Sequence, residues 1–224
     1  MKKVVFIFII SLINVSAIVA QQPFDKKLVL KQMQIANGYF MDKWPDTGKT
    51  IITNKERPSN IWTRAVYYEG LMALHEIYPK ETYYNYAYAW AESHKWGFNS
   101  GNTTRNADNY CAAQTYIDLY NLEPNAFKLK NTKANMNMLL NTPQLDDWSW
   151  IDAIQMGMPV FAKMGVLEKD NRYFEKMYEM YIRLLKGILI KRKYQTVSPI
   201  KAEGQKEKGA KAVDAMSPAS PAYK

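Results

Sequence analysis

The sequence predicts an all-α fold built from helical hairpins. Three observations support this: apolar residues recur at helical spacing, no run alternates as a strand would, and turn signals at Pro79, Pro124 and Lys169 lie 45 residues apart. A second helical pattern begins within a few residues of each turn. Paired helices of this kind bury their apolar faces only by stacking on neighbouring pairs.

Each helix has its own signals in the sequence. The segment "SNIWTRAVYYEGLMALHEIYP" opens with a Ser or Asn start signal and stops at Pro79. In "ADNYCAAQTYIDLYNLEP", Ala113, Tyr116, Ile117 and Tyr120 follow helical spacing, and Pro124 ends the run. The patterns predict helices at 25–43, 61–78, 82–96, 108–122, 126–140, 148–165 and 170–190.

Stacked hairpins form either an open solenoid or a closed ring, and the patterning leaves both open. The chain contains 16 Tyr and 6 Trp. Such side chains make a wall that is apolar but has polar edges, which suits a carbohydrate site. The aromatic content therefore favours a ring with a pocket.

The first 20 residues have the order of a secretory signal peptide. Two lysines precede a long apolar stretch, and small residues surround Ala17 and Ala20. We therefore expect an exported protein, periplasmic or extracellular, with no membrane attachment after cleavage. Cys111 is the only cysteine, so no disulfide is expected, and its helical setting indicates a small core residue.

The positive charge is concentrated near the C-terminus. Residues 183–224 hold ten Lys or Arg against three acidic residues, whereas 21–182 hold eighteen of each sign. A balanced body argues against nucleic-acid binding. We expect a folded domain over 21–182 and, over 183–224, the end of a helix followed by a disordered tail. The abrupt change of composition at about Arg183 also suggests a change of reading frame.

The run "DDWSWIDAIQMGMPVFAKMG" carries a carboxylate, Asp152, where a core helix would place an apolar residue. Taken alone, Asp152 is most simply a solvated or capping aspartate. Asp108 is most simply a helix N-cap, because Asn106 and Asp108 stand where caps belong. Both aspartates lie one hairpin apart beside aromatic residues, and this pairing makes them candidates for a site.

Three segments carry a resemblance to a known family. They are "IWTRAVYYEGLMALHEIYP", "ADNYCAAQTYIDLY" and, most specifically, "WSWIDAIQMGMPVFAKMG". They resemble glycoside hydrolase families 88 and 105, the unsaturated glucuronyl and rhamnogalacturonyl hydrolases. The resemblance implies an (α/α)6 toroid with its site in a central funnel. This chain supplies about seven of the twelve helices and would be a truncated member.

The resemblance also implies site residues and a reaction. Asp152 is implied as the catalytic acid and Asp108 as its assistant, with Trp150 and Trp62 against the sugar. The acid protonates C4 of a C4–C5 unsaturated uronic acid, water adds at C5, and the hemiketal opens. The reaction needs a carboxyl that keeps its proton, and an aromatic wall from Trp148 and Trp150 would favour that.

No cofactor or metal is expected. His75 and His94 are nineteen residues apart, and neither has a second ligand at helical spacing. They are interpreted as surface or helix-end residues.

The chain departs from the family in its second half. It has no His after His94 and no Trp after Trp150, so the family's carboxylate-binding histidine and Arg-Gly-Asn-Gly-Trp-like run are absent. Two functions stay open: a hydrolase of unsaturated oligosaccharides, and an inactive hairpin fragment or binding scaffold. We expect the 224-residue chain to be inactive or nearly so, with possible self-association through exposed half-barrel faces.

Overall fold

The computed structural model describes residues 25–197. The predicted signal peptide lies outside the described residues. Of the segment 183–224, predicted as a helix end and a disordered tail, only residues 183–197 are described. The chain divides into two compact units, one ending at Lys43 and one beginning at Trp44. No helix in the described residues combines the length and the apolar character needed to cross a bilayer.

The described part of the first unit is one helix, α2 (Lys26–Lys43). Asp25 caps it, because its Oδ1 accepts hydrogen bonds from the backbone N–H groups of Lys27, at 2.9 Å, and Leu28, at 3.3 Å. The helix agrees with the range predicted from the sequence.

The second unit opens with a short antiparallel hairpin. Strand β1 (Ile51–Ile52) pairs with β2 (Glu56–Arg57), with Ile51 opposite Arg57. No strand was predicted from the sequence, and this prediction was wrong for these two segments. Each strand has two residues, which is too short for an alternating pattern to register.

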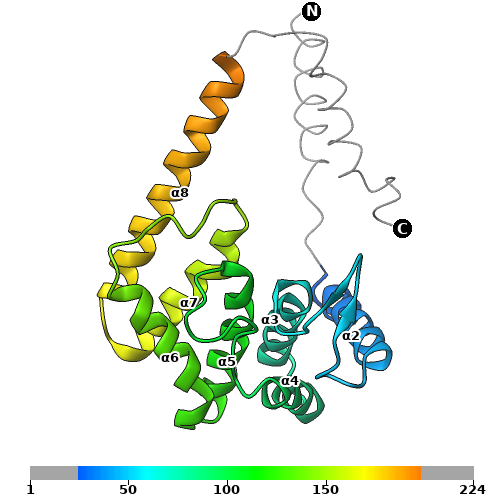
Figure 1. The fold of residues 1–224 in the computed structure, drawn as a ribbon. Coiled ribbons are helices and arrows are strands. Elements are labelled where there is room, and N and C mark those ends of the chain that lie inside the picture. Colours follow the sequence, from blue (N-terminus) through cyan, green and yellow to red (C-terminus); the bar gives the residue numbers. More distant parts are fainter. Residues whose placement is uncertain (1–24, 198–224) are drawn as a thin grey trace, which may run out of the picture. The chain divides into compact units, whose positions relative to one another are not determined.

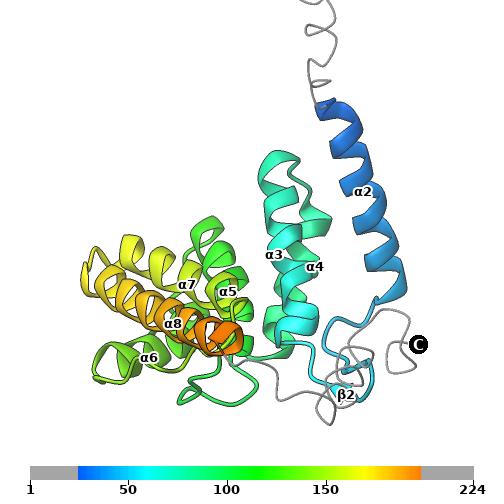
Figure 2. The ribbon, with the colours of Figure 1, turned by 90° about the horizontal axis from the view of Figure 1, so that it is seen from above.

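Three helical hairpins make up the rest of the second unit: α3 (Trp62–Ile77) with α4 (Glu81–Ser93), α5 (Tyr110–Leu122) with α6 (Ala126–Leu140), and α7 (Ala153–Glu168) with α8 (Arg172–Val197). The first helices, α3, α5 and α7, pack side by side in chain order. Each second helix packs on its partner (Figure 1), and Figure 2 shows the same pairing from above. With α2, the described residues contain seven α-helices, which confirms the prediction of an incomplete set of helical hairpins.

The hairpin turns fall at the three predicted positions. Pro79 and Pro124 each lie just after the C-cap residue of a helix, where the missing N–H and fixed φ prevent the helix from continuing. Lys169 ends α7 in the left-handed conformation with φ of 54°. Asp170 then accepts a hydrogen bond from the Arg172 backbone N–H at 3.0 Å and so caps α8.

Four helix boundaries differ from the sequence prediction by three residues or more. Helix α4 ends at Ser93 rather than 96, and α8 continues to Val197 rather than 190. Helix α7 begins at Ala153, five residues later than expected, and ends at Glu168 rather than 165. The residues before it form an irregular segment, and Lys176 of α8 holds that segment by donating to the carbonyls of Thr142, at 2.5 Å, and Gln144, at 2.8 Å.

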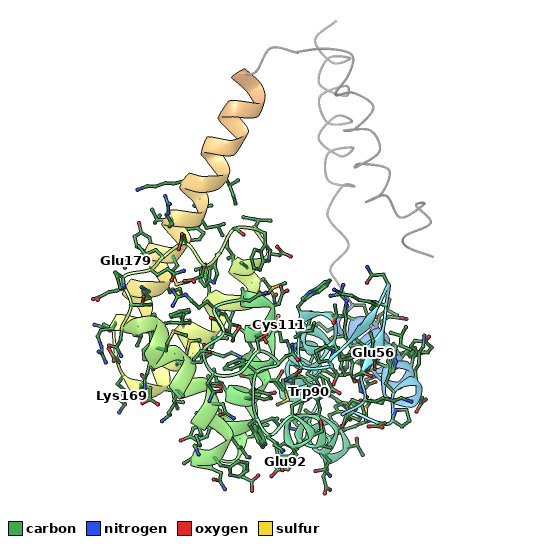
Figure 3. All side chains as sticks on the ribbon, viewed as in Figure 1. Glu56, Trp90, Glu92, Cys111, Lys169 and Glu179 are labelled. Carbon is green, nitrogen blue, oxygen red and sulfur yellow. The ribbon has the colours of Figure 1, made fainter. Side chains whose placement is uncertain are left out.

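The core is centred on α5, which is buried along most of its length. Figure 3 shows Cys111 and Trp90 inside the helical layers, while Glu92, Lys169 and Glu179 lie at the edge. Several of the Tyr and Trp residues that favoured a pocket from the sequence are core residues, and the others whose side chains the structure describes are half-buried or exposed. The rings of Tyr68 and Trp90 stack at 4.0 Å, and both side chains are fully buried.

A glycine permits the close packing of Trp148 on α7. A Cβ added at Gly157 would lie 2.5 Å from Cζ2 of Trp148, whose side chain is only 3% exposed. The same indole meets the ring of Phe161 edge-on at 6.1 Å. Trp148 therefore fastens the irregular segment 141–152 to the helix that follows it.

We expect Gly157→Ala to destabilise the protein by about 1–3 kcal/mol, because the added methyl group overpacks a rigid aromatic contact. Urea unfolding measures the change. Gly70→Ala on α3 is the matched control, since nothing lies within 4 Å of its added Cβ. That variant should be stabilised by about 0.5–1 kcal/mol through helix propensity. Equal changes in both variants would contradict the packing argument.

Candidate active site

Asp108 and Asp152 lie at the beginnings of two neighbouring inner helices. Asp108 is in a short 3₁₀ turn, η2 (Ala107–Asn109), which leads directly into α5. Asn106 caps this turn by accepting the Asp108 N–H at 2.9 Å. Asp152 is the N-cap residue of α7 rather than a residue within the helix, and its side chain makes no capping hydrogen bond. Because α5 and α7 pack side by side, both carboxyls belong to one end of the pair.

The two carboxyls interact electrostatically. Asp108 is half-buried, and burial, followed by the charge of Asp152, raises its pKa above the usual range. The hydrogen bond from Asn106 and the positive charge of Arg57 act in the opposite direction. The structure thus brings the two predicted aspartates together, with Arg57 of β2 as a cation facing Asp108.

The tryptophans have different surroundings. Trp150 is half-buried, and Trp62, the first residue of α3, is 41% exposed. Asp152 is itself exposed, and Trp148 lies beneath α7. Of the aromatic wall expected beside Asp152, Trp148 is therefore a packing residue, and the described residues do not enclose the Asp152 carboxyl.

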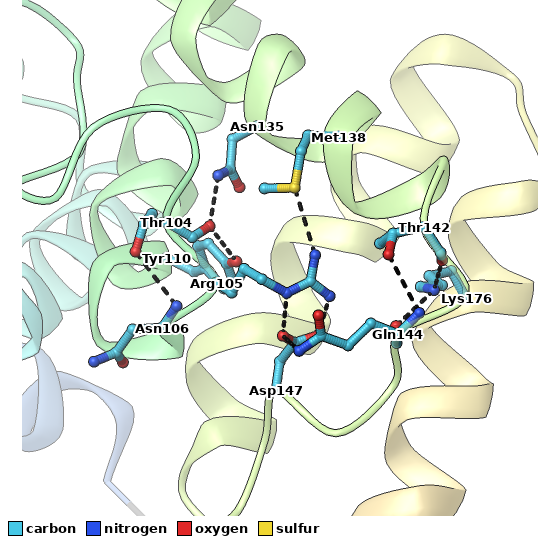
Figure 4. Close-up of polar contacts among 10 residues, drawn as sticks. All are labelled: Thr104, Arg105, Asn106, Tyr110, Asn135, Met138, Thr142, Gln144, Asp147 and Lys176. Atoms are coloured by element: carbon cyan, nitrogen blue, oxygen red, sulfur yellow. Dashed lines mark hydrogen bonds and ion pairs between the residues drawn. The ribbon is translucent and has the colours of Figure 1, made fainter.

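An ion pair joins the segments that carry the two aspartates (Figure 4). Arg105, three residues before Asp108, binds Asp147, five residues before Asp152, through both carboxylate oxygens. The Nη2–Oδ2 distance is 2.6 Å, and the Asp147 side chain is 1% exposed. Paired hydrogen bonds between a guanidinium and a carboxylate fix orientation as well as distance.

Further contacts hold the Asp108 segment in place. Nδ2 of Asn135, on α6, donates to the carbonyls of Asn102 and Thr104, both at 2.8 Å. The Tyr110 hydroxyl donates to the Thr104 carbonyl at 3.1 Å (Figure 4). These bonds satisfy backbone groups that have no helical partner. They also hold the backbone that precedes Asp108 in a defined conformation.

A half-buried carboxyl, Glu69, lies on α3 beside the same two helices. Nε2 of Gln155, in the first turn of α7, donates to Glu69 Oε2 at 2.5 Å. Burial raises the pKa of Glu69 to about 7, although hydrogen bonds from Gln155 and the Cys111 thiol and the charge of Lys163 lower it. Glu69 lines an open cavity of about 530 Å³ together with residues of α3, α5 and α7.

A second polar contact crosses this cavity. Lys163 of α7 donates to Asp118 of α5 at 2.5 Å. Burial nevertheless outweighs this cation and raises the pKa of Asp118 above its usual range. The inner helices are therefore linked by polar contacts as well as by apolar packing.

Pro159 creates another link between α5 and α7. Because proline has no N–H, the carbonyl of Gln155, four residues earlier, lacks its helical donor. Nε2 of Gln114 donates to this oxygen at 2.9 Å. The carbonyl left without a donor by Pro159 is thus hydrogen-bonded by a residue of α5, about one helical turn after Asp152 in the chain.

Sequence reasoning missed Glu69, Arg57 and the Arg105–Asp147 pair. Glu69 did carry a signal, since it is a carboxylate inside the apolar run "AVYYEGLMAL", as Asp152 is in its own run. Arg105 and Asp147 had no such signal, because the two residues are 42 positions apart in the sequence and charged residues in loops are usually solvated.

The part of the chain that the structure describes has no group of three or more His, Cys, Asp or Glu residues arranged to bind a metal ion. The two histidines lie at helix ends: His75 in the last turn of α3, and His94 at the end of α4. His94 Nε2 is 2.6 Å from the Ser59 hydroxyl, which gives it a structural partner.

The stacked helical hairpins place the chain in the class of helical-toroid proteins, of which it forms an incomplete ring. The chain belongs to Glycosyl Hydrolase Family 88, whose model matches residues 32–193. This confirms the resemblance noted in the sequence.

Two solved structures are similar to the chain. A Glycosyl hydrolase family 88 protein from Bacteroides vulgatus matches with 26% identity and a TM-score of 0.59, over 70% of this chain and 46% of its own. A protein named Polysaccharide Lyase BACCELL_00875 matches with 28% identity and a TM-score of 0.62, over 70% of this chain and 45% of its own. The chain therefore spans less than half the length of these structures. No curated protein matches it.

We expect Arg105→Ala to destabilise the protein by about 3 kcal/mol, because it leaves the buried Asp147 carboxylate without its cation. Chemical denaturation followed by circular dichroism measures the loss. Arg172→Ala is the control, since Arg172 forms a similar pair with Asp170 but its side chain is 66% exposed, and such pairs contribute little. A loss in Arg105→Ala no larger than in the control would contradict the role of the buried pair.

The raised pKa of Glu69 predicts a pH effect on stability. The folded protein holds the Glu69 proton up to about pH 7, whereas the unfolded chain releases it near pH 4.3, the usual value for glutamate. The free energy of unfolding contributed by this group is therefore full below about pH 4.3 and falls as the pH rises to about 7. Glu69→Gln should remove this part of the pH dependence.

Thermal unfolding at pH 5 and pH 8 tests this. The midpoint of Glu69→Gln, relative to wild type, should be higher at pH 8 than at pH 5. Glu76→Gln, at an exposed position on the same helix, should show no such change. Identical pH dependence in wild type and Glu69→Gln would disprove the assignment.

Proposed function

We propose that this chain carries the acid–base pair of a hydrolase for unsaturated uronyl oligosaccharides, the products that lyases release from pectin or rhamnogalacturonan. The observation that carries the proposal is the electrostatic pairing of Asp108 and Asp152 at the starts of α5 and α7. Family 88 membership supports a glycoside hydrolase. The substrate class and the reaction are inferred from the resemblance.

In the proposed reaction, a carboxyl donates its proton to C4 of the C4–C5 double bond. Water adds its oxygen at C5, and the remaining proton passes to the carboxylate pair. The resulting hemiketal opens and releases the neighbouring sugar. We assign proton donation to Asp152 and assistance to Asp108, with Trp150 and Trp62 supporting the sugar ring.

A carboxyl pair suits this reaction because two negative charges close together oppose ionisation of both. The pair keeps one proton to a higher pH than an isolated aspartate would. Burial raises the pKa of Asp108 above its usual range and the charge of Asp152 raises it further, which supports this role for the pair. During the reaction, the shared proton is available to the member that faces C4.

A second candidate function is an inactive hairpin scaffold. It is favoured by the lack of any His after His94 and of any Trp after Trp150, because the resemblance places the groups that hold the substrate's carboxylate in that part. Positioning of this kind commonly contributes several kcal/mol to catalysis. We therefore expect turnover by the 224-residue chain to be slow, below about 1 s⁻¹, the low end of ordinary enzymes.

Turnover of an unsaturated disaccharide, followed as loss of ultraviolet absorbance, tests the proposal. We expect slow turnover that Asp152→Asn removes almost completely, since losing the proton donor costs about 10²- to 10⁴-fold. Asp108→Asn should leave a reduced but measurable rate. The control is Glu76→Gln, whose side chain is exposed on α3.

The outcomes separate the candidates. Turnover by wild type no greater than by Asp152→Asn would contradict a hydrolase function for this chain and support the scaffold. If Asp108→Asn were the more damaging change, the assignment of the two roles would be wrong, and the residue with the raised pKa would be the donor.

A further inference from the structure

Glu69 lies where the first turns of the two aspartate-bearing helices meet α3. Gln155, which donates to Glu69 Oε2 at 2.5 Å, is three residues after Asp152. Cys111, three residues after Asp108, is fully buried, and its thiol donates toward the same carboxylate. Each contact is thus about one turn below one member of the acid pair.

These groups form a chain of interactions that links α3, α5 and α7. The negative charge of Asp108 acts on the Cys111 thiol and raises its pKa, and the negative charge of Asp152 does the same to Asp108. Gln155 in turn accepts, through its carbonyl, the hydrogen bond from Gln114 of α5 at 2.9 Å. Among these groups, Glu69 is the one that contacts both first turns from a third helix.

A carboxylate at this position has a cost that packing alone does not explain. Glu69 Oε1 is buried and makes no hydrogen bond of ordinary geometry within the described residues, and burying such a group is unfavourable. The groups facing the carboxyl are Gln155 and Lys163 from α7 and Cys111 and Asp118 from α5. An apolar residue would fill the space without this cost but would not bind the Gln155 amide.

We propose that Glu69 is a positioning residue that sets the separation of the Asp108 and Asp152 carboxyls by holding the first turns of α5 and α7 against α3. The inference rests on the proposed function for the meaning of the pair. Its geometry, however, is testable without any turnover. A residue that only added stability would leave the interaction between the two aspartates unchanged.

The interaction is measured by a double-mutant cycle read out by carbon-13 NMR titration of the Asp108 carboxyl. Asp152→Asn should lower the Asp108 pKa in the wild-type background by removing a negative neighbour. In the Glu69→Ala background the same change should lower it less, by roughly a third or more, because charge interactions weaken as separation grows. Comparing differences cancels any direct effect of the Glu69 charge.

Two further variants sharpen the test. Glu69→Gln keeps an oxygen that accepts from Gln155, so it should retain most of the interaction. Glu76→Ala removes a carboxylate seven residues further along α3 that lines the same cavity, and it should leave the interaction at the wild-type value. If Glu69→Ala does not fold, Gln155→Ala removes the donor of the same hydrogen bond and should weaken the interaction instead.

The inference is overturned if Asp152→Asn shifts the Asp108 pKa equally in the wild-type and Glu69→Ala backgrounds, or not at all in either. It is also overturned if Glu69→Gln loses as much of the interaction as Glu69→Ala. A weakened interaction in a chain that turns over no disaccharide would uphold the positioning role and reject the proposed function. If the chain turns over the disaccharide but Glu69→Ala leaves the interaction between the two aspartates unaltered, the positioning role is rejected and the proposed function is upheld.

Discussion

The burial of α5 between α3 and α7 is the constraint on which the rest of the structure depends. Nine of its thirteen residues are buried, including Ala112 and Ala113, which have no exposed surface. Small residues let neighbouring helices approach closely, and the buried rings of Tyr110 and Tyr116 reach the segment before α5, where their hydroxyls donate to the carbonyls of Thr104 and Gly97. Because the first eight residues of α5 are all buried, the turn that precedes it, and Asp108 with it, is fixed relative to both neighbours.

Polar contacts then define the end of the inner helices where the aspartates lie. The Arg105–Asp147 pair joins the two segments before α5 and α7, and Glu69 joins the turns just after the aspartates. One contact lies on each side of the acid pair along the chain. Groups held from both sides keep a defined separation, which the proposed acid–base pair needs because proton transfer and charge interaction both depend on distance.

Several features of the fold could be predicted from the sequence, because they depend on neighbours along the chain. Helical spacing and the prolines at 79 and 124 located the hairpins, and their 45-residue period matched the structure. The start of α7 was predicted too early, because Trp148 continues the apolar pattern but packs onto Gly157 from outside the helix. The strands at Ile51 and Glu56 were missed since two residues show no period.

The sequence by itself determined the helices, their pairing and the two aspartates as candidates, since periodicity, caps and a carboxylate in an apolar run are local properties. Only the tertiary structure decided that Asp108 is the half-buried member, that aromatic rings such as Tyr68 and Trp90 belong to the core, and that Glu69 contacts both aspartate-bearing helices. The reason is physical: burial, and the charge interactions it strengthens, arise between residues that are distant in sequence, such as Glu69 and Gln155, and no local pattern records their contact.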